Sequence, residues 1–72
     1  GVKRGVLVLG VEDGSLADDI GLQEGDVILE INRKKIETMK DFEKAVRDAN
    51  FEKGILFHIH RKGSSFYLTY KK

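Results

Sequence analysis

Residues 21–32 constrain the fold of this chain most, because a helix stop, a tight turn and an apolar strand follow one another there. Gly21 closes a short helical pattern and supplies the left-handed backbone that commonly ends a helix. Gly25 gives the tight turn, and Asp26 is expected to hydrogen-bond its own backbone and so fix the start of the next strand. The apolar run Val27–Ile31 then predicts that strand. A chain with this segment is expected to combine short helices with strands.

Alternation along this strand places Val27, Leu29 and Ile31 on one face. Ile28 belongs to the other face, yet it is expected to reach the core through the twist of the strand. Further strands are predicted from β-branched or alternating apolar residues at 5–11, at Ile36, at 55–60 and at 66–70.

Two capping signals mark the predicted helices. Ser15 can cap a short helix, with Asp18 three residues later as in a capping box. Thr38 and Asp41 stand in the same relation at the start of a longer helix. Apolar residues recur in this longer helix at helical spacing, which predicts an amphipathic helix. They are Phe42, Ala45, Val46 and Ala49, of which Phe42, Ala45 and Ala49 are expected to face the core, with Phe42 as a central core residue.

The order of elements is strand, short helix over 15–20, strand, very short strand, longer helix over 39–50, and a hairpin turning at Lys62-Gly63. This order predicts an α+β fold, a small, mostly antiparallel, partly open β-barrel or sandwich with two helices. No linker or internal repeat interrupts it. The chain is therefore interpreted as a single domain over residues 1–72, with its core at 5–70.

The composition, 40% hydrophobic and 35% charged, is typical of a globular domain and excludes a disordered tail. Apolar runs such as Gly5–Val11 are far shorter than the roughly 20 residues of a membrane span, so this segment is not expected to insert into a membrane. The lack of cysteine excludes disulfides and thiolate chemistry. The 72 residues are expected to belong to a larger protein.

Residues with catalytic or ligand chemistry are few and scattered. The net charge of +1, without aromatic residues among the basic ones, argues against nucleic-acid binding. His58 and His60 share one strand face, but no third metal ligand follows from the spacing, and both are interpreted as solvent-facing. Asp13, Asp18 and Asp19 lack the pattern of a calcium loop. We expect no catalytic residue, no metal and no cofactor.

One motif is more specific than the elements around it. Gly14-Ser15-Leu16-Ala17 precedes Gly21-Leu22-Gln23-Glu24-Gly25-Asp26-Val27-Ile28 in fixed register, and the helix and hairpin follow. The pattern resembles the PDZ domain of bacterial HtrA (DegP-like) serine proteases, above all their C-terminal PDZ domain, over 5–72. The resemblance implies the permuted bacterial form of the PDZ fold.

Two residues depart from the family pattern. Leu16 stands where the pattern usually has proline, and Arg33 stands where it usually has glycine. Leu16 is expected to place an apolar side chain on the surface. Arg33 is expected to adopt positive φ at a cost of about 1 kcal/mol, unless the turn is of another type.

The resemblance also implies a binding site. PDZ domains bind the end of a peptide as an added strand between a sheet edge and the longer helix. By resemblance, the peptide-binding residues are Met39, Glu43 and Val46 on the helix, and Val6, Leu7 and Val8 on the first strand. Glu43 is expected to disfavour acidic peptides. The loop that receives the peptide carboxylate is expected upstream of Gly5, and Leu9-Gly10-Val11 is assigned to the first strand instead.

The function implied by the resemblance is that of a non-catalytic module in a quality-control serine protease of the periplasm or cell envelope. Its expected partners are hydrophobic peptides or unfolded protein segments, and the protease domain and neighbouring subunits of the parent. One alternative is the PDZ domain of a site-2-type intramembrane metalloprotease or of a C-terminal-processing protease. Another is a structural assembly domain that docks through Leu7 and Leu9, which are expected to point outward.

Overall fold

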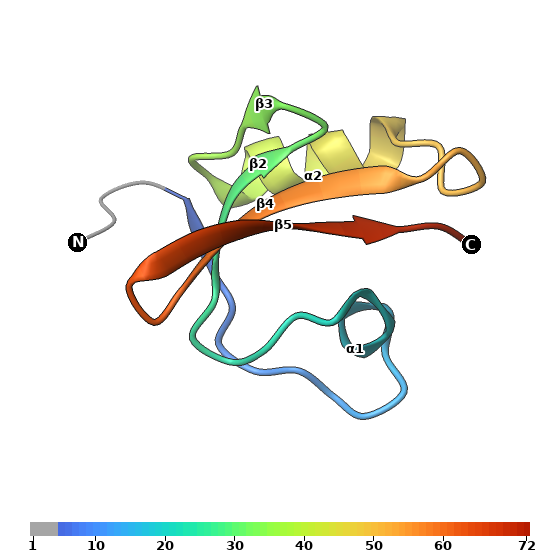
Figure 1. Cartoon of the computed structure of the whole chain (residues 1–72). Helices are drawn as coiled ribbons and strands as arrows, with labels where there is room; N and C mark the ends of the chain where they lie inside the picture. Colours follow the sequence, from blue (N-terminus) through green and yellow to red (C-terminus); the bar gives the residue numbers. More distant parts are fainter. Residues whose placement is uncertain (1–4) are drawn as a thin grey trace.

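A curved sheet and two helices make up the computed structural model, which describes residues 5–72 (Figure 1). The longer helix lies along the middle strands, whereas the shorter helix lies beyond the last strand, on the other side of the molecule. In chain order the elements are β1 (Val6–Leu7), α1 (Leu16–Ile20), β2 (Val27–Ile31), β3 (Lys34–Lys35), α2 (Met39–Asp48), β4 (Ile55–Arg61) and β5 (Ser64–Tyr70).

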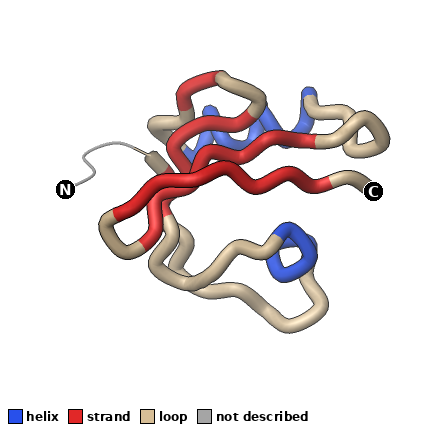
Figure 2. Tube along the Cα trace, in the orientation of Figure 1, coloured by secondary structure: helices blue, strands red, loops and turns tan. Residues whose placement is uncertain are grey.

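All strand pairs of the sheet are antiparallel, in the order β1-β2-β4-β5, and β3 also pairs with β2. This open sheet with two helices confirms the predicted α+β class. The strand predicted at 5–11 is shorter than expected, because ladder pairing covers only Val6–Leu7. The Val8 N–H still donates to the Asp26 carbonyl at 2.8 Å, after which the chain continues as loop to α1 (Figure 2).

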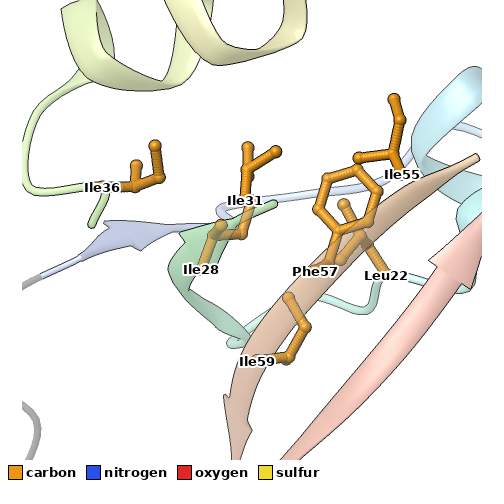
Figure 3. Packing of buried hydrophobic residues seen from close by; sticks show 7 residues of the cluster. All are labelled: Leu22, Ile28, Ile31, Ile36, Ile55, Phe57 and Ile59. Atoms are coloured by element: carbon orange, nitrogen blue, oxygen red, sulfur yellow. The ribbon is translucent and has the colours of Figure 1, made fainter. Parts of the chain in front are cut away.

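The core consists of apolar side chains from β2, β4 and the loops beside them (Figure 3). Along β4 the residues alternate as predicted, with Ile55, Phe57 and Ile59 buried. In β2, both Ile28 and Ile31 are buried. The pairing of β2 with β4 shifts register between Ile28 and Glu30, and this irregularity lets residues three apart face the same core. The full cluster is Leu22, Ile28, Ile31, Ile36, Ile55, Phe57 and Ile59.

The prediction that Phe42 is a central core residue is wrong. Phe42 is only partly buried and packs against the cluster from α2, which contributes no fully buried residue. The sheet itself supplies the central aromatic side chain, Phe57, because β4 lies between β2 and β5. Helix α2 therefore packs on the outside of the core.

Both predicted caps are present. The Ser15 hydroxyl accepts a hydrogen bond from the Asp18 N–H at 3.2 Å, although the Asp18 carboxylate accepts from the Gly14 N–H and so does not complete a box with Ser15. Thr38 and Asp41 form a full capping box at the start of α2. Helix α2 ends at Asp48, slightly before the predicted end, because the backbone of the next residue is extended.

The turn between β2 and β3 carries the one unusual backbone that the sequence predicted. Asn32 and Arg33 have φ values of 51° and 67°, so Arg33 does adopt positive φ. Two successive positive φ values are typical of the type I′ turn, for which Asn-Gly is the preferred pair. The Asn32 carboxamide also accepts from the Leu56 N–H at 2.9 Å, which ties the turn to β4.

We expect Arg33→Gly to raise the free energy of unfolding by up to about 1 kcal/mol, because glycine removes the steric cost of positive φ in this turn. The gain is partly offset by the greater freedom of glycine in the unfolded chain. Urea unfolding of the two proteins measures the difference. Arg33→Ala, which keeps the steric cost, should give no gain.

None of the helices within residues 5–72 is long and apolar enough to cross a bilayer.

Candidate peptide-binding groove

Helix α2 presents the predicted peptide-contacting stripe on its surface. Met39 is 55% exposed and Glu43 is exposed one turn later. Val46, at the end of the stripe, is half-buried and packs against the core. Met39 and Glu43 are thus available to a ligand, whereas Val46 serves the core and offers only part of its surface.

Of the predicted contact residues on the first strand, Leu7 is exposed, whereas Val6 and Val8 face the core. Val6 and Val8 pack against the core, whereas Leu7 is 54% exposed and Leu9 78% exposed. The expectation that Leu7 and Leu9 point outward is confirmed, and Val6 and Val8 are largely unavailable as side-chain contacts. What β1 offers is its backbone, since within residues 5–72 it pairs with a strand on one side only.

The hydrogen bonds of β1 show which backbone groups point to the free edge. Val8 uses both its N–H, to the Asp26 carbonyl, and its carbonyl, from the Gly25 N–H, toward the β2 side, each at 2.8 Å. Because successive residues of a strand point their backbone groups to opposite sides, those of Leu7, which precedes Val8 in β1, point away from β2. An extended segment added at this edge would therefore pair with Leu7.

Close packing of β1 on β2 requires glycine at the start of the strand. Gly5 has a φ of 131°, and a Cβ placed on it would lie 2.6 Å from the Val27 Cγ1 and 2.7 Å from the Ile28 carbonyl oxygen. A larger residue would push β1 away from β2. Gly5 thus fixes the position of the free edge.

A buried ion pair anchors the start of β2. Asp26 is fully buried, and its two carboxylate oxygens each accept a 2.7 Å hydrogen bond from the Arg61 guanidinium. The Gln23 N–H donates to the same carboxylate at 2.9 Å, in place of the hydrogen bond to its own backbone expected for Asp26. Arg61 also donates to the Gly21 carbonyl and lies over the Phe66 ring, 4.8 Å from its centroid. The pair joins the end of α1, the start of β2 and the end of β4.

The sequence did not single out Arg61 as the partner of Asp26. Hydrogen bonds from the Arg61 side chain lower the pKa of Asp26, and the same contact raises the pKa of Arg61. The only available signal was strand order, because a β2–β4 pairing places residue 61 beside residue 26. That pairing is not readable from one sequence.

The lowered pKa of Asp26 predicts acid-sensitive stability. Its folded pKa lies below the unfolded value, so the stabilisation is present above about pH 4 and is lost as pH falls through the folded pKa. We expect the urea midpoint to fall between pH 5 and pH 2.5. Asp26→Asn should be less stable at pH 7 and should lose less stability over this range. An equal loss in both proteins would assign the effect to other carboxylates, such as Asp41, whose pKa is also lowered, mainly by the Glu37 N–H.

Both histidines were predicted to face solvent, but neither is fully exposed. His58 is half-buried, with its ring stacked on Tyr67 at 4.5 Å between centroids. His60 on the same strand is also half-buried. Within residues 5–72, no group of three or more histidine, cysteine, aspartate or glutamate side chains is arranged to hold a metal ion.

Comparison with known proteins identifies the fold family. The PDZ domain family model matches residues 7–56. Two similar proteins are both named "Probable periplasmic serine endoprotease DegP-like". The one from Chlamydia pneumoniae is 36% identical over 53 residues, which are 74% of this chain and 11% of the relative. The one from Pseudomonas fluorescens is 33% identical over 70 residues, which are 97% of this chain and 14% of the relative.

Solved structures agree on the fold. The HtrA3 PDZ domain, crystallised with a phage-derived ligand (FGRWV), superposes with a TM-score of 0.85 at 21% identity, over 97% of this chain and 61% of that chain. The PDZ domain of the SdrC-like protein from Listeria monocytogenes gives a TM-score of 0.78 at 21% identity, over 99% of this chain and 74% of that chain.

The chain spans only 11% and 14% of the lengths of the two curated relatives, which are serine proteases by name. The peptide-contacting roles of Met39, Glu43 and Val46, and of Val6, Leu7 and Val8, stay predictions. The family model, the relatives and the fold together show that this chain belongs to the PDZ domain family and is related to the PDZ domains of HtrA/DegP serine proteases.

Proposed function

We propose that this chain is the substrate-recruiting PDZ module of an HtrA-type serine protease of the cell envelope, and that it is not itself catalytic. The observation that carries the proposal is the free edge of β1 (Val6–Leu7), which pairs only with β2 within residues 5–72 and leaves the backbone of Leu7 without a strand partner there. The periplasmic protease names of the relatives support the location and the protease parent. The peptide-bound HtrA3 neighbour supports a peptide ligand.

In this proposal an extended peptide segment adds to the edge of β1 and lies toward α2. Main-chain hydrogen bonds to Leu7 give affinity, and apolar side chains of the peptide contact Met39 and the exposed part of Val46. Glu43 disfavours acidic peptides by charge repulsion. Any carboxylate-binding loop upstream of Gly5, including one formed by residues 1–4, lies outside the described residues.

The proposed partners are hydrophobic peptides and unfolded segments of envelope proteins, together with the protease domain and neighbouring subunits of the parent. A second function, docking on a neighbouring subunit without a peptide ligand, is favoured by one specific observation. Leu7 and Leu9 form an exposed apolar pair beside a strand edge that has no partner within residues 5–72.

Calorimetry with two matched apolar peptides, one ending in a carboxylate and one in an amide, tests the peptide-binding proposal. Because the carboxylate loop is expected upstream of Gly5 and not within residues 5–72, we expect weak binding that is equal for the two peptides. Charge-assisted hydrogen bonds are worth about 1.5–3 kcal/mol each, so losing two weakens binding roughly a hundredfold or more. A clear preference for the free acid at micromolar affinity would show a working loop in residues 1–11.

A charge reversal tests the role of α2. Glu43→Lys should improve binding of an acidic variant of the peptide and leave the neutral peptide unchanged, because only the local charge differs. Lys44→Glu, on the next residue of the helix, is the matched control and should not alter peptide preference. Absence of binding by every peptide would favour the docking function.

A further inference from the structure

A row of polar and aromatic side chains crosses four strands of the sheet. In the strand register, Lys35 of β3 lies opposite Glu30 of β2, Glu30 opposite His58 of β4, and His58 opposite Tyr67 of β5. Directly opposed side chains on one face of a sheet lie close enough to interact. None of these four residues belongs to the β1 edge or to the α2 stripe described above.

One ring nitrogen of His58, at the centre of the row, lacks a hydrogen bond within residues 5–72. Its Nδ1 atom is buried and has no hydrogen-bond partner within the described residues. Buried polar atoms are nearly always paired in folded proteins, so this atom requires an explanation. The Glu30 carboxylate lies nearby, with its Oε1 3.9 Å from Nδ1. That separation is too long for a hydrogen bond, and a shortening of about 1 Å would bring the two atoms into hydrogen-bond range.

A contact between Glu30 and His58 would lie where the pairing of β2 with β4 is irregular. The β2–β4 register shifts between Ile28 and Glu30, so the backbone ladder is irregular immediately beside Glu30. The Leu29 carbonyl accepts from the Ile36 N–H at 3.0 Å, which links the same irregularity to the segment that leads into α2. A side-chain contact between Glu30 and His58 would reinforce β2 against β4 where the ladder is weakest.

We propose that Glu30 and His58 form a proton-dependent clasp between β2 and β4. When His58 takes up a proton from solvent, its Nδ1–H donates a charge-assisted hydrogen bond to the Glu30 carboxylate, at about 2.7–2.9 Å. When the proton leaves, this attraction is lost and the contact returns to the open distance. Stacking on Tyr67, with the ring planes 14° apart, holds the imidazole in the orientation that the clasp needs.

The other charged groups around His58 are compatible with the clasp. Glu30 on β2 and Glu37 before α2 line a cavity of about 250 Å³ together with His58, and Lys35 on β3 lines the same cavity. The cavity has room for the water that delivers the proton, since a water occupies about 30 Å³ in the liquid. Tyr67 on β5 is the remaining titratable neighbour, and it contacts the face of the ring.

A double-mutant cycle at two pH values tests the proposal. The proteins are the wild type, Glu30→Gln, His58→Phe and the double variant, where phenylalanine keeps the ring stack and cannot take up a proton. The two pH values, 5.5 and 8.5, lie on either side of the ordinary pKa of a histidine side chain, about 6.5. We expect a non-additive shift of the thermal midpoint of about 4 °C or more at pH 5.5, and additivity at pH 8.5.

His60 is the matched control, because it lies on the same strand opposite Val27 and Ser65, neither of which carries a charge. The cycle of His60→Phe with Glu30→Gln should be additive at both pH values. Equal coupling of His58 and Glu30 at both pH values, or no coupling at pH 5.5, would overturn the proposal. Equal coupling in the His60 cycle would also overturn it, as a general charge effect. If His58→Phe fails to fold, His58→Gln takes its place in the same cycle.

Discussion

Arg61→Ala should destabilise the domain by about 3–5 kcal/mol, because it leaves the buried Asp26 carboxylate without its charged partner. The hydrogen bond from the Gln23 N–H would then be the one remaining bond to the Asp26 carboxylate that the structure describes. Small domains are stable by only about 5–15 kcal/mol, so the variant should be partly unfolded at room temperature. Urea unfolding followed by circular dichroism measures the loss.

Three further variants distinguish this explanation from a simple loss of packing. Arg61→Lys should recover only part of the stability, because an ammonium cannot donate through a two-pronged fork to both carboxylate oxygens. Adding Asp26→Ala to Arg61→Ala should recover stability relative to Arg61→Ala alone, because the unpaired buried charge is then gone. Arg47→Ala, at an exposed arginine of α2, should cost less than about 1 kcal/mol. A double variant less stable than Arg61→Ala would contradict the role given to the ion pair.

Phe57→Ala should cost about 3–5 kcal/mol, because Phe57 is fully buried at the centre of the core cluster (Figure 3). Phe42→Ala should cost clearly less, because Phe42 is only partly buried against the cluster. Both changes remove the same atoms, so the difference between them measures how deeply each ring lies. Thermal unfolding of the two variants side by side gives the comparison. Equal costs would mean that α2 docks more deeply on the core than the structure has it.

Features set by local sequence were predicted well. Ser15 and Thr38 cap the two helices, Gly21 ends the first with a φ of 98°, and β4 alternates between buried and half-buried residues. Each depends on neighbours within a few residues. Such signals suffice for the element order, and the Gly-Asp motif that carries the family resemblance lies within one of these segments.

Features set by the pairing of distant segments were not predicted. Ile28 was correctly expected in the core, but through the twist of the strand, whereas its burial together with Ile31 follows from a register shift against β4 that single-strand alternation does not contain. The choice of Arg61 as the partner of Asp26 depends on the same strand pairing. The depth of Phe42 was overestimated because helical periodicity shows which side of α2 faces inward and not how far the helix sinks into the core.

The exposure of the candidate site residues was predicted in part for the same reason, while their binding roles stay predictions. Helical spacing correctly placed Met39 and Glu43 on an accessible stripe, and alternation correctly turned Leu7 outward. Val46 packs against the core with part of its side chain and exposes the rest, because it lies at the border between the stripe and the core. Sequence periodicity does not separate these two roles of one side chain.

Amide chemical-shift mapping with an apolar peptide tests most directly whether the edge of β1 and the stripe on α2 form one binding site. The protein is titrated with the peptide, and the shift changes are mapped onto the structure of residues 5–72. We predict that the largest shifts fall on residues 7–9 and 39–46, with little change along β5. Saturable shifts confined to other residues, with residues 7–9 and 39–46 unchanged, would contradict the proposed groove.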